Sequence, residues 1–158
     1  MVFSLAAVAA EKKDASKKST ESATSEQHVL LNPADLKWGN APSGLPPGAK
    51  PPVLAGDPNK KGLLTVRLQP PAGYKVPPHT HPTSEHITVI SGTFNIGTGD
   101  KFDEETGKEM GAGGYMVMPP GMKPYAWTPA ETIIQIHGMG PFVINYVNPT
   151  DDPRNAKK

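Results

Sequence analysis

The stretch GYKVPPHTHPTSEHITVISG, residues 73–92, contains three of the chain's five histidines and a glutamate among them. His79 and His81 lie two residues apart, so on a β-strand both imidazoles point to the same face. The proline, threonine and serine that follow can turn the chain, so that Glu85 begins a second strand of a hairpin and returns its carboxylate toward the imidazoles. His86 then points to the opposite face.

This combination of side chains has two interpretations, a metal site and a polar turn. Two neutral imidazoles and one carboxylate suit Fe(II), Mn, Zn, Ni or Cu, and such a set leaves coordination positions open for substrate or water. A polar turn with solvated histidines explains the same residues, because His-x-His pairs are common. The spacing alone therefore leaves both interpretations open.

The surrounding sequence predicts an all-β fold. In GLLTVRLQP (62–70), apolar Leu64, Val66 and Leu68 alternate with polar residues, as in a half-buried strand. Similar short segments, separated by turn residues at a spacing of roughly ten positions, favour a sandwich or barrel. A helical turn is predicted only for the charged segment 101–110. The other predicted strands are 74–81, 85–97 with a turn at Ser91-Gly92, 113–121, 123–131, 132–140 and 142–148.

Length and composition predict one compact domain and exclude some functions. The chain has 158 residues, and its 19 prolines and 16 glycines favour many turns and few long helices. The net charge of +1, without a basic patch interleaved with aromatic residues, gives no indication of nucleic-acid binding. The absence of cysteine excludes disulfides and thiolate ligands, and it leaves the cellular compartment open.

The first 27 residues are predicted to lie outside the domain. MVFSLAAVAA (1–10) resembles the end of a secretory signal, with a candidate cleavage site at Ala7-Val8-Ala9, although no Lys or Arg precedes it. This favours a periplasmic or secreted protein, and the alternative is a cytoplasmic protein with an apolar N-terminus. The run is too short to span a membrane. Residues 11–27 lack large apolar side chains and are predicted to be a disordered linker.

Residues 28–61 are rich in proline, which excludes long helices there. We expect this segment to form an extended arm with short edge strands. The arm is predicted to lie over the main body or over a partner subunit in a homodimer. The main domain is then expected at 62–150, and a tail at 151–158.

The quoted stretch matches the first signature of the cupin superfamily at every position. That signature is a glycine, five residues, His-x-His, three residues, a glutamate, six residues and a glycine. The segment GGYMVMPPG (113–121) is similar to the second cupin signature. The chain therefore resembles a small, single-domain bacterial cupin. This resemblance implies a β-barrel of jelly-roll type, in which His79, His81 and Glu85 hold one divalent transition metal ion.

The chain departs from the family at one expected ligand. Three residues after Pro-x-Gly, where cupins have a histidine, stands Pro124, whose side chain cannot bind metal. Tyr125 and His137 are candidate replacements, and Lys123 is a poorer one because its amine is protonated. His137 lies on a predicted core strand and shares a face with Gln135, a candidate partner for its second ring nitrogen. His137, Tyr125 and Gln135 are therefore also candidate catalytic residues, His137 as an acid or base.

The resemblance leads to two functional hypotheses. The first is a metal-dependent enzyme that acts on a small organic molecule as an oxygenase, a decarboxylase, or an isomerase or lyase of sugar acids. The second is a non-catalytic module that binds or senses a metal or a carbohydrate. The retained signatures favour the enzyme, whereas the missing fourth ligand favours the binding module. In both cases the expected partner is a small molecule or carbohydrate.

Overall fold

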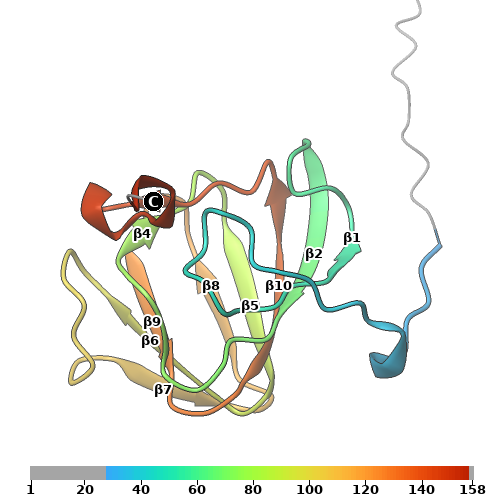
Figure 1. Ribbon diagram of the computed structural model, residues 1–158, viewed down its shortest axis with the longest axis horizontal. Helices are drawn as coiled ribbons and strands as arrows, with labels where there is room; N and C mark the ends of the chain where they lie inside the picture. The colour runs from blue at the N-terminus through green and yellow to red at the C-terminus, as the bar shows by residue number, and fades with distance from the viewer. Residues whose placement is uncertain (1–27, 157–158) are drawn as a thin grey trace, which may run out of the picture.

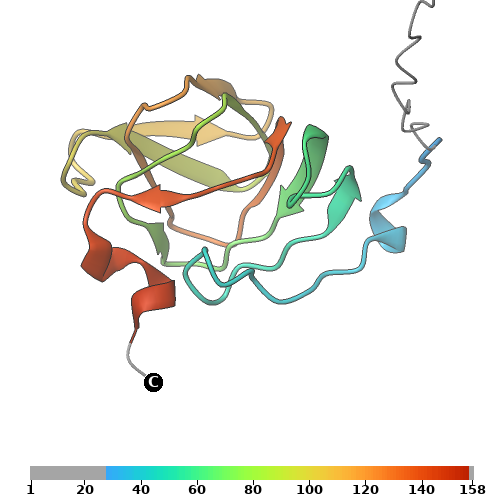
Figure 2. The same cartoon turned by 90° about the horizontal axis from the view of Figure 1, so that it is seen from above.

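The computed structural model describes residues 28–156, and the predictions for residues 1–27 concern a segment outside this range. Two antiparallel sheets face each other and form a barrel (Figures 1 and 2). The described part has eleven strands, three short 3-10 turns and no α-helix. It also contains no helix long and apolar enough to cross a membrane. The predicted all-β barrel is confirmed.

Five strands form the larger sheet, with β10 at its centre. In order across the sheet they are β1 (Val53–Ala55), β2 (Gly62–Leu68), β10 (Ile133–Gly140), β5 (Glu85–Ser91) and β8 (Tyr115–Met118). Each neighbouring pair is antiparallel. The strands predicted from alternation near 62–70, 85–91 and 132–140 therefore all lie side by side in this sheet.

Four strands form the smaller sheet. In order they are β3 (Tyr74–Val76), β9 (Pro124–Thr128), β6 (Thr93–Thr98) and β7 (Lys108–Gly111). The chain passes from the larger to the smaller sheet between β5 and β6. Gly92 makes this turn with φ of +79°, a conformation that other residues rarely adopt. A Cβ at this position would lie 2.7 Å from the carbonyl oxygen of Glu131, so the turn requires glycine.

His79 lies on a short strand outside both large sheets, and His81 follows this strand directly. β4 (His79–Thr80) pairs with β11 (Asn145–Tyr146), near the end of the described chain. The predicted hairpin between β4 and β5 is therefore wrong. Pro78 and Pro82 flank β4, and their missing N–H groups limit the strand to two residues, which pair with β11.

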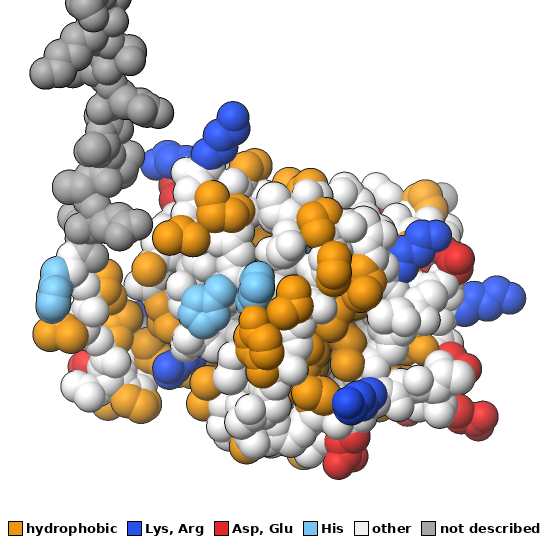
Figure 3. All heavy atoms as spheres, turned by 180° about the vertical axis from the view of Figure 1, so that it is seen from behind, with side chains coloured by type: hydrophobic (Ala, Val, Ile, Leu, Met, Phe, Trp, Pro, Cys, Tyr) orange, Lys and Arg blue, Asp and Glu red, His pale blue; other side chains and the backbone are white. Residues whose placement is uncertain are grey.

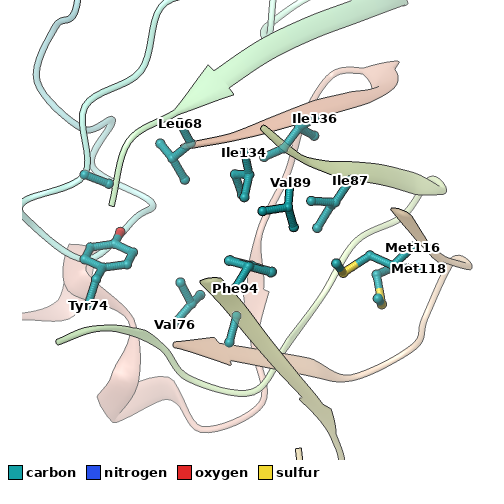
Figure 4. Packing of buried hydrophobic residues seen from close by; sticks show 12 residues of the cluster. Leu68, Tyr74, Val76, Ile87, Val89, Phe94, Met116, Met118, Ile134 and Ile136 are labelled. Carbon is teal, nitrogen blue, oxygen red and sulfur yellow. The ribbon is translucent and has the colours of Figure 1, made fainter. Parts of the chain in front are cut away.

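The core lies between the two sheets. Alternation along β10 places Ile134 and Ile136 on the inner face, and Ile136 lies opposite Ile87 of β5 in register. Phe94 and Val76 of the smaller sheet face them across the barrel (Figure 4). Burial of each such side chain contributes about 1.5–3 kcal/mol to stability. The apolar alternation in the sequence thus determines which face of each strand turns inward.

The charged segment 101–110 does not contain a helical turn, and that prediction is wrong. Its last residues belong to β7, which pairs with β6. The preceding loop turns at Asp103, whose Oδ1 accepts the Glu105 N–H at 2.9 Å. An aspartate that bonds the backbone two residues ahead favours a turn over a helix. The Asp103 carbonyl also accepts the Tyr125 hydroxyl at 2.9 Å, which fixes the loop against β9.

The proline-rich arm runs along one side of its own barrel (Figure 2). It contains one 3-10 turn, η1 (Pro33–Asp35), and adds β1 to the edge of β2. Two tyrosine hydroxyls hold it: Tyr74 donates to the Pro46 carbonyl at 2.8 Å, and Tyr146 donates to the Gly44 carbonyl at 2.9 Å. The arm is thus part of the domain surface.

Two further 3-10 turns, η2 (Pro149–Asp151) and η3 (Pro153–Asn155), follow β11. Arg154 fastens this segment, because its Nη2 donates to the Ile144 carbonyl at 2.9 Å and to Asp152 at 2.7 Å. The chain on the C-terminal side of β10 is therefore held near β4.

Candidate functional site

A cavity of about 310 Å³ lies between the two sheets. Side chains from both sheets, from the arm and from the segment after β10 line it. Among the described residues of the lining there is no lysine or arginine. Its polar members are Asn40, Asn59, Tyr74, His79, His81 and Glu85.

The two histidines of the motif enter this cavity in defined tautomers. Both are buried, and their rings lie 5.0 Å apart at 90°. Nδ1 of His79 donates to the Pro77 carbonyl at 2.8 Å, and Nδ1 of His81 donates to the Val143 carbonyl at 2.8 Å. Because a carbonyl only accepts, each Nδ1 carries the hydrogen, and each Nε2 keeps its lone pair free to bind a ligand. Metal-binding histidines are usually oriented in this way.

Glu85 begins β5 beside the two rings. Its carboxylate is buried, with Oε2 3.5 Å from Nε2 of His81. The second motif also reaches this point, because the Gly121 N–H donates to the His81 carbonyl at 3.0 Å. Both sequence motifs therefore meet at one end of β5.

Burial dominates the electrostatics of the three side chains. It lowers the pKa of His79 to about 4, although the bond to the Pro77 carbonyl opposes this change. It also lowers the pKa of His81 and raises the pKa of Glu85 to about 7. Within the described residues no lysine or arginine forms an ion pair with Glu85. The imidazoles are thus neutral, and the carboxylate lacks a compensating positive charge.

The chemistry of these donors fits a divalent transition metal. Two free Nε2 lone pairs and one carboxylate are suitable ligands, and the ion would supply the missing positive charge. The three side chains lie farther apart than the ligands around a bound metal ion. Across residues 28–156 no group of three or more His, Cys, Asp or Glu side chains is arranged closely enough to enclose an ion.

Tyr125 lies on the other side of β9 from the cavity. Its hydroxyl contacts the Asp103 carbonyl and, at 2.8 Å, Oγ1 of Thr106. Its neighbours Pro124 and Ala126 line the cavity instead. Pro124 thus stands at the wall where the family resemblance implies a ligand, and Tyr125 is not brought to the three motif residues.

His137 and Gln135 share a face of β10, as expected, but it is the outer face. The residues that alternate with them along β10, Ile134 and Ile136, line the cavity. His137 is exposed, and its Nε2 lies 3.2 Å from Nε2 of Gln135. It sits opposite the half-buried His86 in register. Figure 3 shows a face of the molecule on which histidine and hydrophobic side chains are exposed. The structure therefore separates His137 and Gln135 from His79, His81 and Glu85.

The groups that hold the two imidazoles could not be recognised in the sequence. The Phe142 ring packs against His81 with centroids 4.7 Å apart, and Tyr146 lies 6.0 Å from His79. Together with the Val143 carbonyl, this segment covers the histidines from the side of β11. The carbonyls of Pro77 and Val143 left no sequence signal, because every residue has one. The aromatic residues in FVINY were the only indication.

Comparison with known proteins agrees with this architecture. A family model described as the ChrR cupin-like domain matches residues 26–143. No curated protein matches the chain. Among solved structures, the polyketide cyclase RemF from Streptomyces resistomycificus superimposes with a TM-score of 0.65 at 16% identity, covering 81% of this chain and 91% of RemF. An RmlC-like cupin from Shewanella frigidimarina gives 0.56 at 18% identity, covering 72% and 92%.

A salicylate 1,2-dioxygenase from Pseudoaminobacter salicylatoxidans is also similar, with a TM-score of 0.50 at 15% identity, covering 63% of this chain and 27% of the dioxygenase. At such low identity these structures show a shared fold. They confirm the jelly-roll barrel that the first motif implied.

Proposed function

The chain belongs to the ChrR cupin-like family, and from this premise we propose that it is a metal-dependent enzyme acting on a small organic molecule inside the barrel. His79, His81 and Glu85 hold one divalent transition metal ion. The structural neighbours include a polyketide cyclase and a dioxygenase, so the fold is compatible with enzymes on small molecules. The proposed chemistry is oxygenation or decarboxylation, which are reactions that the family resemblance implies.

One observation carries this proposal. The carbonyls of Pro77 and Val143 bind the Nδ1 hydrogens of His79 and His81, and both free Nε2 atoms therefore belong to buried rings of the cavity. Solvated histidines of a polar turn would be exposed and would not have both tautomers determined by the backbone. Burial of Glu85 next to these rings adds the carboxylate that completes a two-histidine, one-carboxylate set.

The chain's own residues have defined parts in this function. When bound, the metal would polarise substrate oxygens or carry dioxygen. The two backbone carbonyls keep the imidazoles in the metal-binding tautomer, and Phe142 covers the ring of His81. The apolar walls exclude water from the reacting groups. Pro124 contributes no ligand, so the proposed site has three protein ligands and open positions.

Metal content tests the proposal. Protein purified without a histidine tag is expected to contain a transition metal by plasma emission spectroscopy, and His79→Ala/His81→Ala should lose it. His86→Ala is the matched control, because His86 follows Glu85 directly but bonds the Tyr115 hydroxyl at 2.7 Å outside the cavity. Equal metal in the double variant and the wild type would contradict the proposal.

A non-catalytic binding module is the second candidate, and one observation favours it. Once His79, His81 and Glu85 serve as ligands, the only other titratable group of the lining is Tyr74, whose hydroxyl is engaged by the Pro46 carbonyl. No separate acid or base therefore faces the cavity from the described residues. A turnover screen under dioxygen, comparing metal-loaded wild type with His79→Ala, separates the two functions. Export and homodimer assembly stay predictions.

A further inference from the structure

We propose that the occupant of the barrel is a largely hydrocarbon molecule without charged groups along its body, whose few oxygen atoms are confined to one end. This inference rests on the proposed function, because it names the substrate class of the same site. It narrows the expected partners to apolar compounds and sets carbohydrates and sugar acids aside.

Away from the His79, His81 and Glu85 cluster, both sheets line the cavity with apolar side chains. The larger sheet contributes Leu64, Val66, Leu68, Ile87, Ile134 and Ile136, and the smaller sheet contributes Val76, Phe94, Ile96 and Ala126. Figure 4 shows several of these side chains pointing toward one another across the barrel. Sugar hydroxyls against such walls would lose their hydrogen bonds to water and find no partners, which is costly for each group.

The polar groups of the lining are either gathered together or already engaged. His79, His81 and Glu85 form one cluster. The ring centroids of the two histidines lie 5.0 Å apart, and Oε2 of Glu85 lies 3.5 Å from Nε2 of His81. The Tyr74 hydroxyl donates to the arm. Asn40 and Asn59 are exposed, so they belong to the rim of the cavity. A ligand inside therefore meets polar atoms at one place, and its own polar atoms must lie there.

The absence of positively charged side chains from the described lining also favours an apolar ligand. The described lining contains no lysine or arginine, so no side chain is available to pair with a carboxylate or phosphate along the walls. A metal at the cluster can accept one anionic group, but it cannot reach groups farther along the molecule. Molecules with several charges or many hydroxyls are thus excluded whether or not the metal is present.

The volume limits the size of the ligand. An apolar cavity of about 150 Å³ holds one benzene molecule. The cavity of about 310 Å³ is therefore suited to a compact molecule of roughly one ring with substituents. Leu45 and Pro42 of the arm close one side, held by the hydroxyls of Tyr74 and Tyr146.

Calorimetric titration of the full chain with acetophenone, benzoate and D-xylose tests this inference. The first is a neutral aryl ketone, the second an anion of the same size, and the third a polyhydroxylated sugar of similar size. Each is measured after dialysis against EDTA, so that metal coordination by benzoate does not contribute. Acetophenone is expected to bind at least tenfold more tightly than either of the others. Equal or tighter binding of benzoate or xylose, or no binding of acetophenone at millimolar concentration, would overturn the inference.

Two variants link binding to the cavity. Val66→Phe fills the interior and should weaken acetophenone binding at least tenfold, and Val66→Thr, with nearly the same shape, should weaken it severalfold. Val117→Thr is the matched control on β8, because Val117 is exposed and does not line the cavity. Unchanged binding in both Val66 variants would place the probe elsewhere and overturn the inference.

The metal assay keeps the two proposals separable. Selective acetophenone binding in a chain whose metal content does not depend on His79 and His81 would refute the metal enzyme and leave the apolar ligand class standing. Metal loss in the double variant together with unselective probe binding would do the reverse.

Discussion

Replacing Glu85 with glutamine in the metal-free protein is expected to stabilise the fold, by an amount that grows with pH. Burial raises the pKa of the Glu85 carboxyl from its usual value of 4.5 to about 7. Between these values the folded chain keeps a proton that the unfolded chain has released, so the free energy of unfolding falls as the pH rises. Glutamine does not ionise and avoids this loss.

The structure sets the size of the effect. At about 1.36 kcal/mol per pH unit, a carboxyl with a pKa of about 7 instead of 4.5 loses roughly 3 kcal/mol once the pH exceeds 7. About 1 kcal/mol of this loss is already present at pH 5. The advantage of Glu85→Gln over wild type should therefore be about 2 kcal/mol larger at pH 8 than at pH 5. Comparing the two pH values removes any constant effect of the substitution.

Urea unfolding in EDTA, followed by tryptophan fluorescence at pH 5 and pH 8, measures this difference. Glu109→Gln is the matched control, because Glu109 is an exposed carboxylate on β7. Added zinc should reverse the ranking, since metal that binds only the folded wild type raises its stability. An advantage that is the same at both pH values would refute the idea that Glu85 is buried without a compensating charge.

Two other substitutions test the site and the fold. Pro124→His is expected to add a ligand at the cavity wall and tighten metal binding about tenfold in a competitive chelator titration, or roughly 1.4 kcal/mol; unchanged affinity would show that the backbone of β9 does not present the ring. Gly92→Ala should lower the free energy of unfolding by about 1–3 kcal/mol, because φ is +79° and the Glu131 carbonyl is in the way. Gly111→Ala, with nothing within 4 Å of the added Cβ, should change it by much less.

The strand period predicted correctly which residues share a face, and this accounts for much of the fold. It placed His79 with His81 and Gln135 with His137. A period of two residues does not state which face is interior. On β10 the isoleucines occupy the interior, because their burial stabilises the folded state, whereas an exposed imidazole keeps its hydrogen bonds to water. The prediction of His137 as a ligand gave too little weight to that competition.

Other features could not be predicted because their cause lies far away in the chain or in the backbone. The Val143 carbonyl that orients His81 lies 62 residues away in sequence, and any residue type would provide it. The partner of β4 is similarly remote, since Asn145 pairs with Thr80. The first motif indicated only which side chains could bind a metal and how far apart they stand in the sequence. Tertiary contacts then decided which strand would carry the histidines and which segment would cover them.

The docked arm lines the cavity but contributes only β1 to the two large sheets. Ligand selectivity and barrel stability therefore depend largely on different residues. Residues of the arm between Asn40 and Asn59 form part of the cavity wall, yet the ladders of both large sheets consist mostly of later strands. Substitutions at Pro42 or Leu45 therefore reshape the chamber without changing the register of β2, β5 or β10. Exchanging this short proline-rich stretch would therefore change which molecules the cavity admits while leaving His79, His81 and Glu85 in place.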